Sequence, residues 1–178
     1  MLKVYSKHPL VSSRYGIYSH RLGDGWLTGG ASNTGGAVLR KFFSDDEIVR
    51  FSQEIDPMHP LDLGYYPLPA AGERFPRSAP EMQPVLQPRP DNPRDFLPAI
   101  LEGIAAIEAE GYGRLTELGA PFPKRVYTSG GGAVNETWRR IRQRRLGIPV
   151  LQAAHTEAAY GAALIARGGI PGSGPARH

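Results

Sequence analysis

The pattern of apolar and polar residues predicts short strands at the start of the chain. Residues 2–5, 14–19 and 25–28 are short segments rich in β-branched and aromatic side chains, which are typical of strands. The Gly-Asp-Gly triplet at 23–25 predicts a hairpin turn between the last two segments. Residues 29–36 are glycines and other small residues, and they favour a flexible loop over a strand or a core.

Two short helices are expected next. Residues 37–43 have a helical pattern, with Asn33 or Thr34 as the cap. Ser44 and Glu47 fit the capping-box pattern Ser-x-x-Glu, which marks the start of a helix. The residues after this box place apolar side chains three and four positions apart, as on one helix face: Ile48, Phe51 and Ile55.

The middle of the chain combines a Pro-rich connection with the clearest helix. Residues 56–93 hold most of the 17 prolines and indicate an insertion that covers something or packs on a neighbour, with a strand expected at 61–66. Asn92 and Pro93 then begin a helix, because proline suits the first helical position. The apolar stripe of this helix comprises Leu97, Ile100, Leu101, Ile104 and Ile107. Three glutamates lie off that stripe: Glu102, Glu108 and Glu110.

The last part of the chain alternates strands and helices. Residues 124–128 predict a strand that ends at Ser129 and three glycines. A helix over 133–145 follows, with three residues expected on its buried face: Val134, Trp138 and Ile141. Residues 147–151 lead into another strand, and a helix over 156–166 carries small residues that suit close packing. This order indicates an α/β sandwich.

Composition narrows the class of protein. The chain has 178 residues and a mass of 19.4 kDa, which suits one domain or a piece of a larger one. It has no cysteine, which excludes disulfides, thiolate metal sites and cysteine nucleophiles. The five histidines show no metal-ligand spacing, so we expect no metal site in the protein itself. No apolar run reaches the about 20 residues of a membrane span, and no signal-peptide pattern is visible, so we expect a cytoplasmic protein without a membrane partner.

The charge balance is slightly basic. Lys and Arg number 21 against 17 Asp and Glu, a net charge of +4. Much of this excess lies in one cluster: Arg139, Arg140, Arg142, Arg144 and Arg145. We interpret the cluster as the solvated face of a helix, because no aromatic residues interleave with the arginines, and we expect no nucleic-acid partner. Attraction of an anionic nucleotide or RNA is the alternative.

Two segments share the design of a strand, a run of glycines and a helix. The first ends in Gly35, Gly36 and Ala37, and the second runs from Gly130 to Asn135. A glycine backbone lets a ligand approach closely, and the free N–H groups of a helix start favour phosphate or a polar nucleotide edge. Asn135 is expected one turn into the second helix, where its amide would reach such a ligand. Two tight turns without a ligand are the alternative, because the sequence has neither a Walker pattern nor a dinucleotide fingerprint.

A resemblance to a known family rests on several of these segments. Residues 127–138, followed by 146–150 and 157–163, resemble the C-terminal signature of the FGGY carbohydrate kinases. Residues 29–37 resemble the earlier glycine segment of that family, and residues 18–26 are similar to its D-ribulose kinase and xylulokinase-like group. The resemblance extends over most of the chain and is specific, because separated segments match in order.

The resemblance implies an α/β fold of the ribonuclease H-like (actin-like ATPase) kind, as an incomplete lobe with a Pro-rich insertion. Residues 1–168 would form the C-terminal, nucleotide-binding domain without its first strands, and residues 169–178 would form a flexible tail. ATP would lie in a cleft between two lobes, with Mg²⁺ held through the phosphates rather than by protein ligands. The residues implied to hold the nucleotide are Gly36, Arg40, Gly130, Gly131, Gly132, Ala133 and Asn135.

The implied function is transfer of the γ-phosphate of ATP to a sugar hydroxyl, with a ketopentose such as D-ribulose as the expected substrate. The Asp-x-Gly-Thr motif and the catalytic aspartate of the family have no match in this sequence, so no catalytic residue is assigned. The sugar would then bind only together with the missing N-terminal lobe. We expect the lobe to associate with copies of itself or with a separately encoded N-terminal half. The alternative is a non-catalytic fragment that binds a nucleotide or a partner without turnover.

Overall fold

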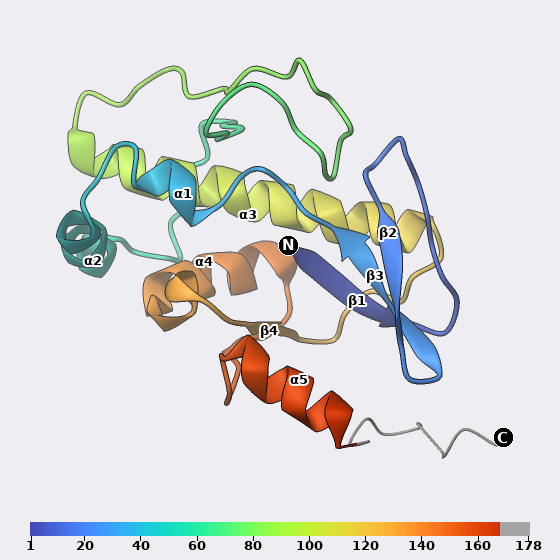
Figure 1. Ribbon diagram of the computed structural model, residues 1–178. Helices are drawn as coiled ribbons and strands as arrows, with labels where there is room; N and C mark the ends of the chain where they lie inside the picture. The colour runs from blue at the N-terminus through green and yellow to red at the C-terminus, as the bar shows by residue number, and fades with distance from the viewer. Residues whose placement is uncertain (168–178) are drawn as a thin grey trace, which may run out of the picture.

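The computed structural model describes residues 1–167, in which two β-sheets lie beside one long helix (Figure 1). The strands, in chain order, are β1 (Leu2–Ser6), β2 (Tyr18–Leu22), β3 (Gly25–Gly30), β4 (Val126–Thr128) and β5 (Val150–Gln152). The first three form an antiparallel sheet in the order β1-β3-β2, and the last two form a separate parallel pair. The predicted α/β class is confirmed.

Three helices follow β3 in succession, and helical segments also follow β4 and β5. In chain order they are α1 (Gly36–Leu39), α2 (Asp45–Glu54), α3 (Pro93–Glu117), the 3-10 turn η1 (Gly131–Val134), α4 (Glu136–Leu146) and α5 (Ala158–Ala166). None of the helices within residues 1–167 combines the length and the apolar character needed to cross a membrane. The tail expected at 169–178 lies outside the described residues.

In the antiparallel sheet the predicted hairpin forms, but two expectations about its strands are wrong. The strand expected at 14–19 overlaps β2 only at its end, because the residues at 12 and 17 pair in an isolated bridge and those between them turn. Gly29 and Gly30, expected in a loop, are the last two residues of β3. A side-chain carbon on Gly30 would meet the ring of Phe75 at 2.3 Å, so glycine lets the strand and this core ring pack closely.

Helix α1 is shorter than expected and begins differently. It has four residues, and Gly35 precedes it without a side-chain hydrogen bond. Asn33 and Thr34 do not cap it, because their side chains bind the Pro-rich connection instead. Asn33 Nδ2 donates to the carbonyl of Gly72 at 2.9 Å, and Thr34 Oγ1 donates to that of Pro67 at 2.5 Å.

Helices α2 and α3 begin as predicted. Ser44 Oγ accepts a hydrogen bond from the Glu47 amide at 3.3 Å, and the Glu47 carboxylate accepts one from the Ser44 amide at 2.8 Å, which completes the capping box. The side chain of Asn92 caps α3, and Pro93 is its first residue. The expected stripe of α3 is buried, and most of it belongs to the main apolar cluster together with Phe96. Helices α2 and α4 and strand β3 pack against α3.

The Pro-rich connection covers α3, as expected of an insertion (Figure 1, green). Its buried side chains include Tyr65, which packs edge-on against Phe96 of α3. The prediction of a strand at 61–66 is wrong, because this part of the connection forms only an isolated bridge between Tyr66 and Val85.

Helix α4 begins at Glu136 rather than at 133. The loop tightens into the 3-10 turn η1 first, and Asn135 is the residue that caps α4. Val134, expected in the core, is therefore exposed. Ile141 is buried, and Trp138 packs against the main apolar cluster.

The arginine cluster of α4 is a solvated face only in part, which corrects the sequence interpretation, because Arg140 and Arg145 are exposed but others of the cluster are not. Arg142 is buried, and its Nε and Nη2 donate to the Glu108 carboxylate at 2.6 and 2.7 Å. Arg144 pairs with Glu102, which is buried in α3 although it lies off the apolar stripe. Both pairs join α3 to α4, so the charges serve the packing of two helices.

Helix α5 begins at Ala158 rather than at 156, and it remains uncovered. Every residue of α5 whose exposure is described is exposed, including three large apolar side chains: Tyr160, Leu164 and Ile165. The close packing predicted from its small residues is therefore wrong for the 1–167 structure.

Candidate nucleotide site

A large cavity brings the two glycine segments together. Its volume is about 1090 Å³. Gly35 and Gly36 line it from the start of α1, and Ser129 and Gly132 line it from the loop after β4. These segments are far apart in the sequence, and the sheets and α3 place them on one hollow.

Some of the residues predicted to hold a nucleotide line this cavity, and others lie in the loop beside it. Gly36, Arg40, Gly132 and Asn135 line the cavity. Gly130 and Gly131 belong to the same loop, at the start of η1. Ala133 lies in η1 and is buried, so its side chain supports the loop from inside the protein.

Gly36 is not required by the fold. A side-chain carbon placed on it would meet no other atom within 4 Å, and its φ lies outside the left-handed region that favours glycine. Glycine at a helical position costs about 0.5–1 kcal/mol relative to alanine. Close approach of a ligand to the backbone would explain why this position is a glycine.

Asn135 differs from its expected position. It precedes α4, where its Oδ1 accepts a hydrogen bond from the Trp138 amide at 2.9 Å. Its Nδ2 donates to Ser52 Oγ of α2 at 2.8 Å. Both ends of the amide are therefore used within the protein, and Asn135 links the glycine loop to α2.

Ser52 is a site residue that the sequence reasoning missed. It is buried, and its carbonyl also accepts a hydrogen bond from Thr137 Oγ1 at 2.8 Å. The available signal was its place on the inward face of α2, four residues after Ile48 and next to Phe51. A serine on such a face needs a partner when buried, and Asn135, the cap of α4, provides it.

Three arginines line the cavity, and two of them, Arg40 and Arg140, are exposed. Arg40 Nε donates to Asp45 at 2.9 Å, and both side chains are largely exposed. Exposed pairs contribute about 0–1 kcal/mol, so redirecting Arg40 toward an anionic ligand costs little. Arg140 also lines the cavity and is exposed. The buried Arg142, by contrast, is held by Glu108 and by Thr128 Oγ1 at 3.0 Å.

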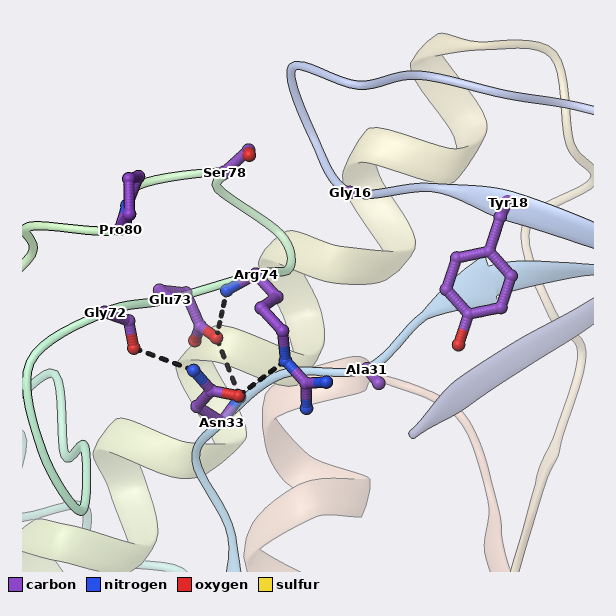
Figure 2. Close-up of a pocket in the computed structure, with 9 residues that line it drawn as sticks. All are labelled: Gly16, Tyr18, Ala31, Asn33, Gly72, Glu73, Arg74, Ser78 and Pro80. Atoms are coloured by element: carbon purple, nitrogen blue, oxygen red, sulfur yellow. Dashed lines mark hydrogen bonds between the residues drawn. The ribbon is translucent and has the colours of Figure 1, made fainter.

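A second cavity of about 510 Å³ lies beside the first glycine segment, and Figure 2 shows its polar residues. Glu73 is buried there, and its carboxylate accepts hydrogen bonds from the amides of Asn33 and Arg74 at 2.7 and 2.8 Å. Ser32 Oγ and the Tyr66 hydroxyl donate to the same carboxylate at 2.6 and 3.1 Å. Burial, and then the charge of Glu73, raise the pKa of Tyr66, so its hydroxyl stays a donor.

Glu73 therefore fixes the loop that leads to Gly36. Arg74 Nε donates to Asn33 Oδ1 at 2.6 Å, which closes the network around Asn33 (Figure 2). No sequence pattern pointed to Glu73, which lies in the middle of the Pro-rich connection. Within residues 1–167, no group of three or more His, Asp and Glu side chains is placed to hold a metal ion.

Comparisons with known proteins agree on one family. Residues 6–167 match the C-terminal domain of the FGGY family of carbohydrate kinases. Among solved structures, xylulose kinase from Bifidobacterium adolescentis aligns with a TM-score of 0.69 and 21% identity, over 93% of this chain and 35% of that one. Gluconate kinase from Lactobacillus acidophilus aligns with a TM-score of 0.70 and 18% identity, over 95% and 37% of the two chains. Xylulose kinase from Rhodospirillum rubrum aligns with a TM-score of 0.67 and 19% identity, over 97% and 37%.

These alignments show the fold and the extent of the chain relative to similar structures. The α/β arrangement is that of an actin-like ATPase lobe, as the sequence resemblance implied. The chain spans only 35–37% of the length of the three kinases.

Proposed function

Since this chain belongs to the FGGY family of carbohydrate kinases, through their C-terminal domain, we propose that it is the ATP-binding lobe of an enzyme that phosphorylates a sugar. The observation that carries the proposal is the cavity shared by the two glycine segments. Gly36 adds to it, because the fold does not require glycine there and a closely bound ligand does. When bound, ATP supplies the phosphoryl group, and this lobe holds and orients it.

Each part of the cavity suits a part of the nucleotide. Open backbone at Gly36, and the exposed Gly132 beside Trp138, give a flat base room to lie against the chain. The exposed guanidinium groups of Arg40 and Arg140 supply positive charge for phosphates. Asn135 and Ser52 hold the loop and α2 in place around that space. Mg²⁺ would be held through the phosphates, which agrees with the family's need for charge neutralisation.

The sugar acceptor is proposed to be a ketopentose, with D-ribulose first. Its support is the similarity of residues 18–26 to the D-ribulose kinase group, together with the fold shared with xylulose kinases. The fold is shared with a gluconate kinase as well. D-ribulose, D-xylulose and gluconate should therefore be compared in one assay.

A substitution at Gly36 tests nucleotide binding. Gly36→Val should reduce ADP affinity at least tenfold by isothermal titration, because the branched side chain enters the open space, while the melting temperature stays near that of the parent. Gly113→Val is the matched control, because a side chain at Gly113 also has free space but this residue does not line the cavity. Equal ADP affinity in the parent and in both variants would show that the nucleotide does not bind in this cavity.

A second candidate function is nucleotide binding without turnover. It is favoured by the lack of an Asp-x-Gly-Thr motif and of an assigned catalytic aspartate. In an ATP-coupled assay with D-ribulose, D-xylulose or gluconate, we expect this chain alone to give no ADP above the background. Turnover by the chain alone would contradict this candidate. It would also contradict the expectation that the sugar binds only together with an N-terminal lobe.

A further inference from the structure

We propose that the second cavity is a binding site for a small organic oxyanion, that is, a phosphate or carboxylate group on a short polar carbon skeleton. The guanidinium group of Arg74 would hold the charged group of this ligand. Binding at this site does not depend on a nucleotide in the larger cavity.

The first observation is the fixed position of the Arg74 side chain. Its Nε donates a hydrogen bond to Asn33 Oδ1 at 2.6 Å, and Asn33 Nδ2 donates in turn to the carbonyl of Gly72 at 2.9 Å. Within residues 1–167 Nη1 and Nη2 of Arg74 form no hydrogen bond, and Figure 2 shows both pointing away from Asn33 toward Ala31. A guanidinium group held at one nitrogen in this way can bind two oxygens of an oxyanion with the other two.

The second observation is that the charge of this cavity favours an anion. Glu73 is the one carboxylate among the described residues that line it, and each of its oxygens accepts two hydrogen bonds from elsewhere in the protein. In the described part of the chain, Glu73 makes no ion pair with the Arg74 guanidinium. A further cation lies beside one wall, because Lys3 Nζ is 3.7 Å from the centroid of the Tyr18 ring. The positive charge of Arg74 is therefore available to a ligand.

The third observation is that the cavity suits a small organic molecule better than a bare ion. Its volume of about 510 Å³ falls within the range of about 300–1,000 Å³ that is typical of small-molecule sites. Tyr18, Ala31 and Pro80 line it and offer apolar surface to a carbon skeleton. Ser78 also lines it, and its hydroxyl suits a hydroxyl group of the ligand.

The second cavity is separate from the larger one. Residues 31–34 run between them, and their side chains alternate. Ala31 and Asn33 line the second cavity, whereas Ser32 and Thr34 line the larger one. No described residue lines both cavities. An anion bound at Arg74 is therefore not the phosphate of a nucleotide in the larger cavity.

Titration of the full chain with matched ligands tests the proposal. D-Ribose 5-phosphate carries a phosphate, D-gluconate carries a carboxylate, and D-ribose is the uncharged control. Isothermal titration should show binding of at least one of the two anions and none of D-ribose, because the guanidinium recognises the charged group. Inorganic phosphate should bind at least tenfold more weakly than D-ribose 5-phosphate, because it lacks the carbon skeleton.

Two variants show whether Arg74 holds the charge. Arg74→Gln should weaken binding of the anion at least tenfold, because the amide has neither the charge nor the paired donors of the guanidinium group. Arg125→Gln is the matched control, because it also removes an exposed arginine but lines neither cavity, and it should leave the affinity unchanged.

Amide chemical shifts of the parent chain give a second measurement that needs no variant. The bound anion should shift the amides of residues 16–18 and 72–78, which border the second cavity, and not those of residues 129–140, which border the larger one.

The outcomes decide between the alternatives. Absence of binding by either anion, or the same affinity in the parent and in Arg74→Gln, would overturn the proposal. Inorganic phosphate binding as tightly as D-ribose 5-phosphate would also overturn it, because the carbon skeleton would then contribute nothing. Shifts confined to residues 129–140 would place the anion in the larger cavity and reject the site. ADP titration of Gly36→Val reports on the larger cavity alone, so this proposal and the proposed function fail separately.

Discussion

At the scale of single residues, the glycine loop depends on Asn135 in a way that its motif does not show. Its oxygen caps α4 through the Trp138 amide, and its nitrogen binds Ser52 of α2. The side chain thus connects two helices that border the cavity. A change at this position should alter protein stability before it alters any ligand contact.

Asn135→Ala should lower the free energy of unfolding by about 1–2 kcal/mol, because it removes a helix cap and leaves a buried Ser52 hydroxyl without its donor. Asn135→Asp should cost less, since a carboxylate still accepts from the Trp138 amide. Urea denaturation of the two variants measures the difference. An alanine variant as stable as the parent would show that the cap and the Ser52 bond contribute nothing net.

The sequence predicted part of this site and not the rest, for physical reasons. Runs of glycine mark backbone that a ligand can approach, and Gly36 and Gly132 do line one cavity. The cap at Asn135 and the buried carboxylate of Glu73 depend on partners far away in the chain. No local pattern encodes such a partner, because hydrogen bonds of this kind are set by the tertiary fold.

At the scale of elements, ion pairs between α3 and α4 decide how two helices pack. Arg142 makes two short hydrogen bonds to Glu108, and both side chains are mostly buried. The absence of aromatic residues among the arginines of α4 predicted a solvated face, and that prediction was wrong for Arg142, which is buried. Periodicity describes one helix, whereas the glutamates that bind these arginines are on another.

Arg142→Met should lower the free energy of unfolding by about 3–5 kcal/mol, because the Glu108 carboxylate is left without its partner in a mostly buried place. Adding Glu108→Leu should restore much of that loss, since two apolar side chains then replace the pair. Arg140→Met, at an exposed position of the same helix, is the control and should change stability by less than about 0.5 kcal/mol. Chemical denaturation of the four proteins tests the pairing.

The double variant decides the interpretation. If Arg142→Met and the double variant lose the same free energy, the cost comes from lost packing of the arginine stem and not from an unpaired carboxylate. If Arg142→Met costs no more than Arg140→Met, the pair does not stabilise the helix interface.

At the scale of the whole molecule, the sequence indicated the fold class and the order of strands and helices, but not how the strands divide into two sheets. Each strand was predicted from its own residues, and no local pattern states which neighbour a strand lacks. The structure adds that information, because β1 and β4 end their sheets in the described residues and α5 stays uncovered. Uncovered apolar surface of this kind favours association of copies.

Ile165 is the most exposed of the large apolar residues on α5 and is suited to test that association. Ile165→Gln removes apolar surface without changing the net charge, so it should weaken self-association severalfold in sedimentation experiments at several concentrations. The melting temperature should stay the same, because the side chain is 53% exposed and contributes little to the fold. Val11→Gln is the matched control, an exposed apolar residue away from α5, and should leave association unchanged. Equal weakening in both variants would point to general surface apolarity, and no weakening in either would mean that α5 takes no part in contacts between copies.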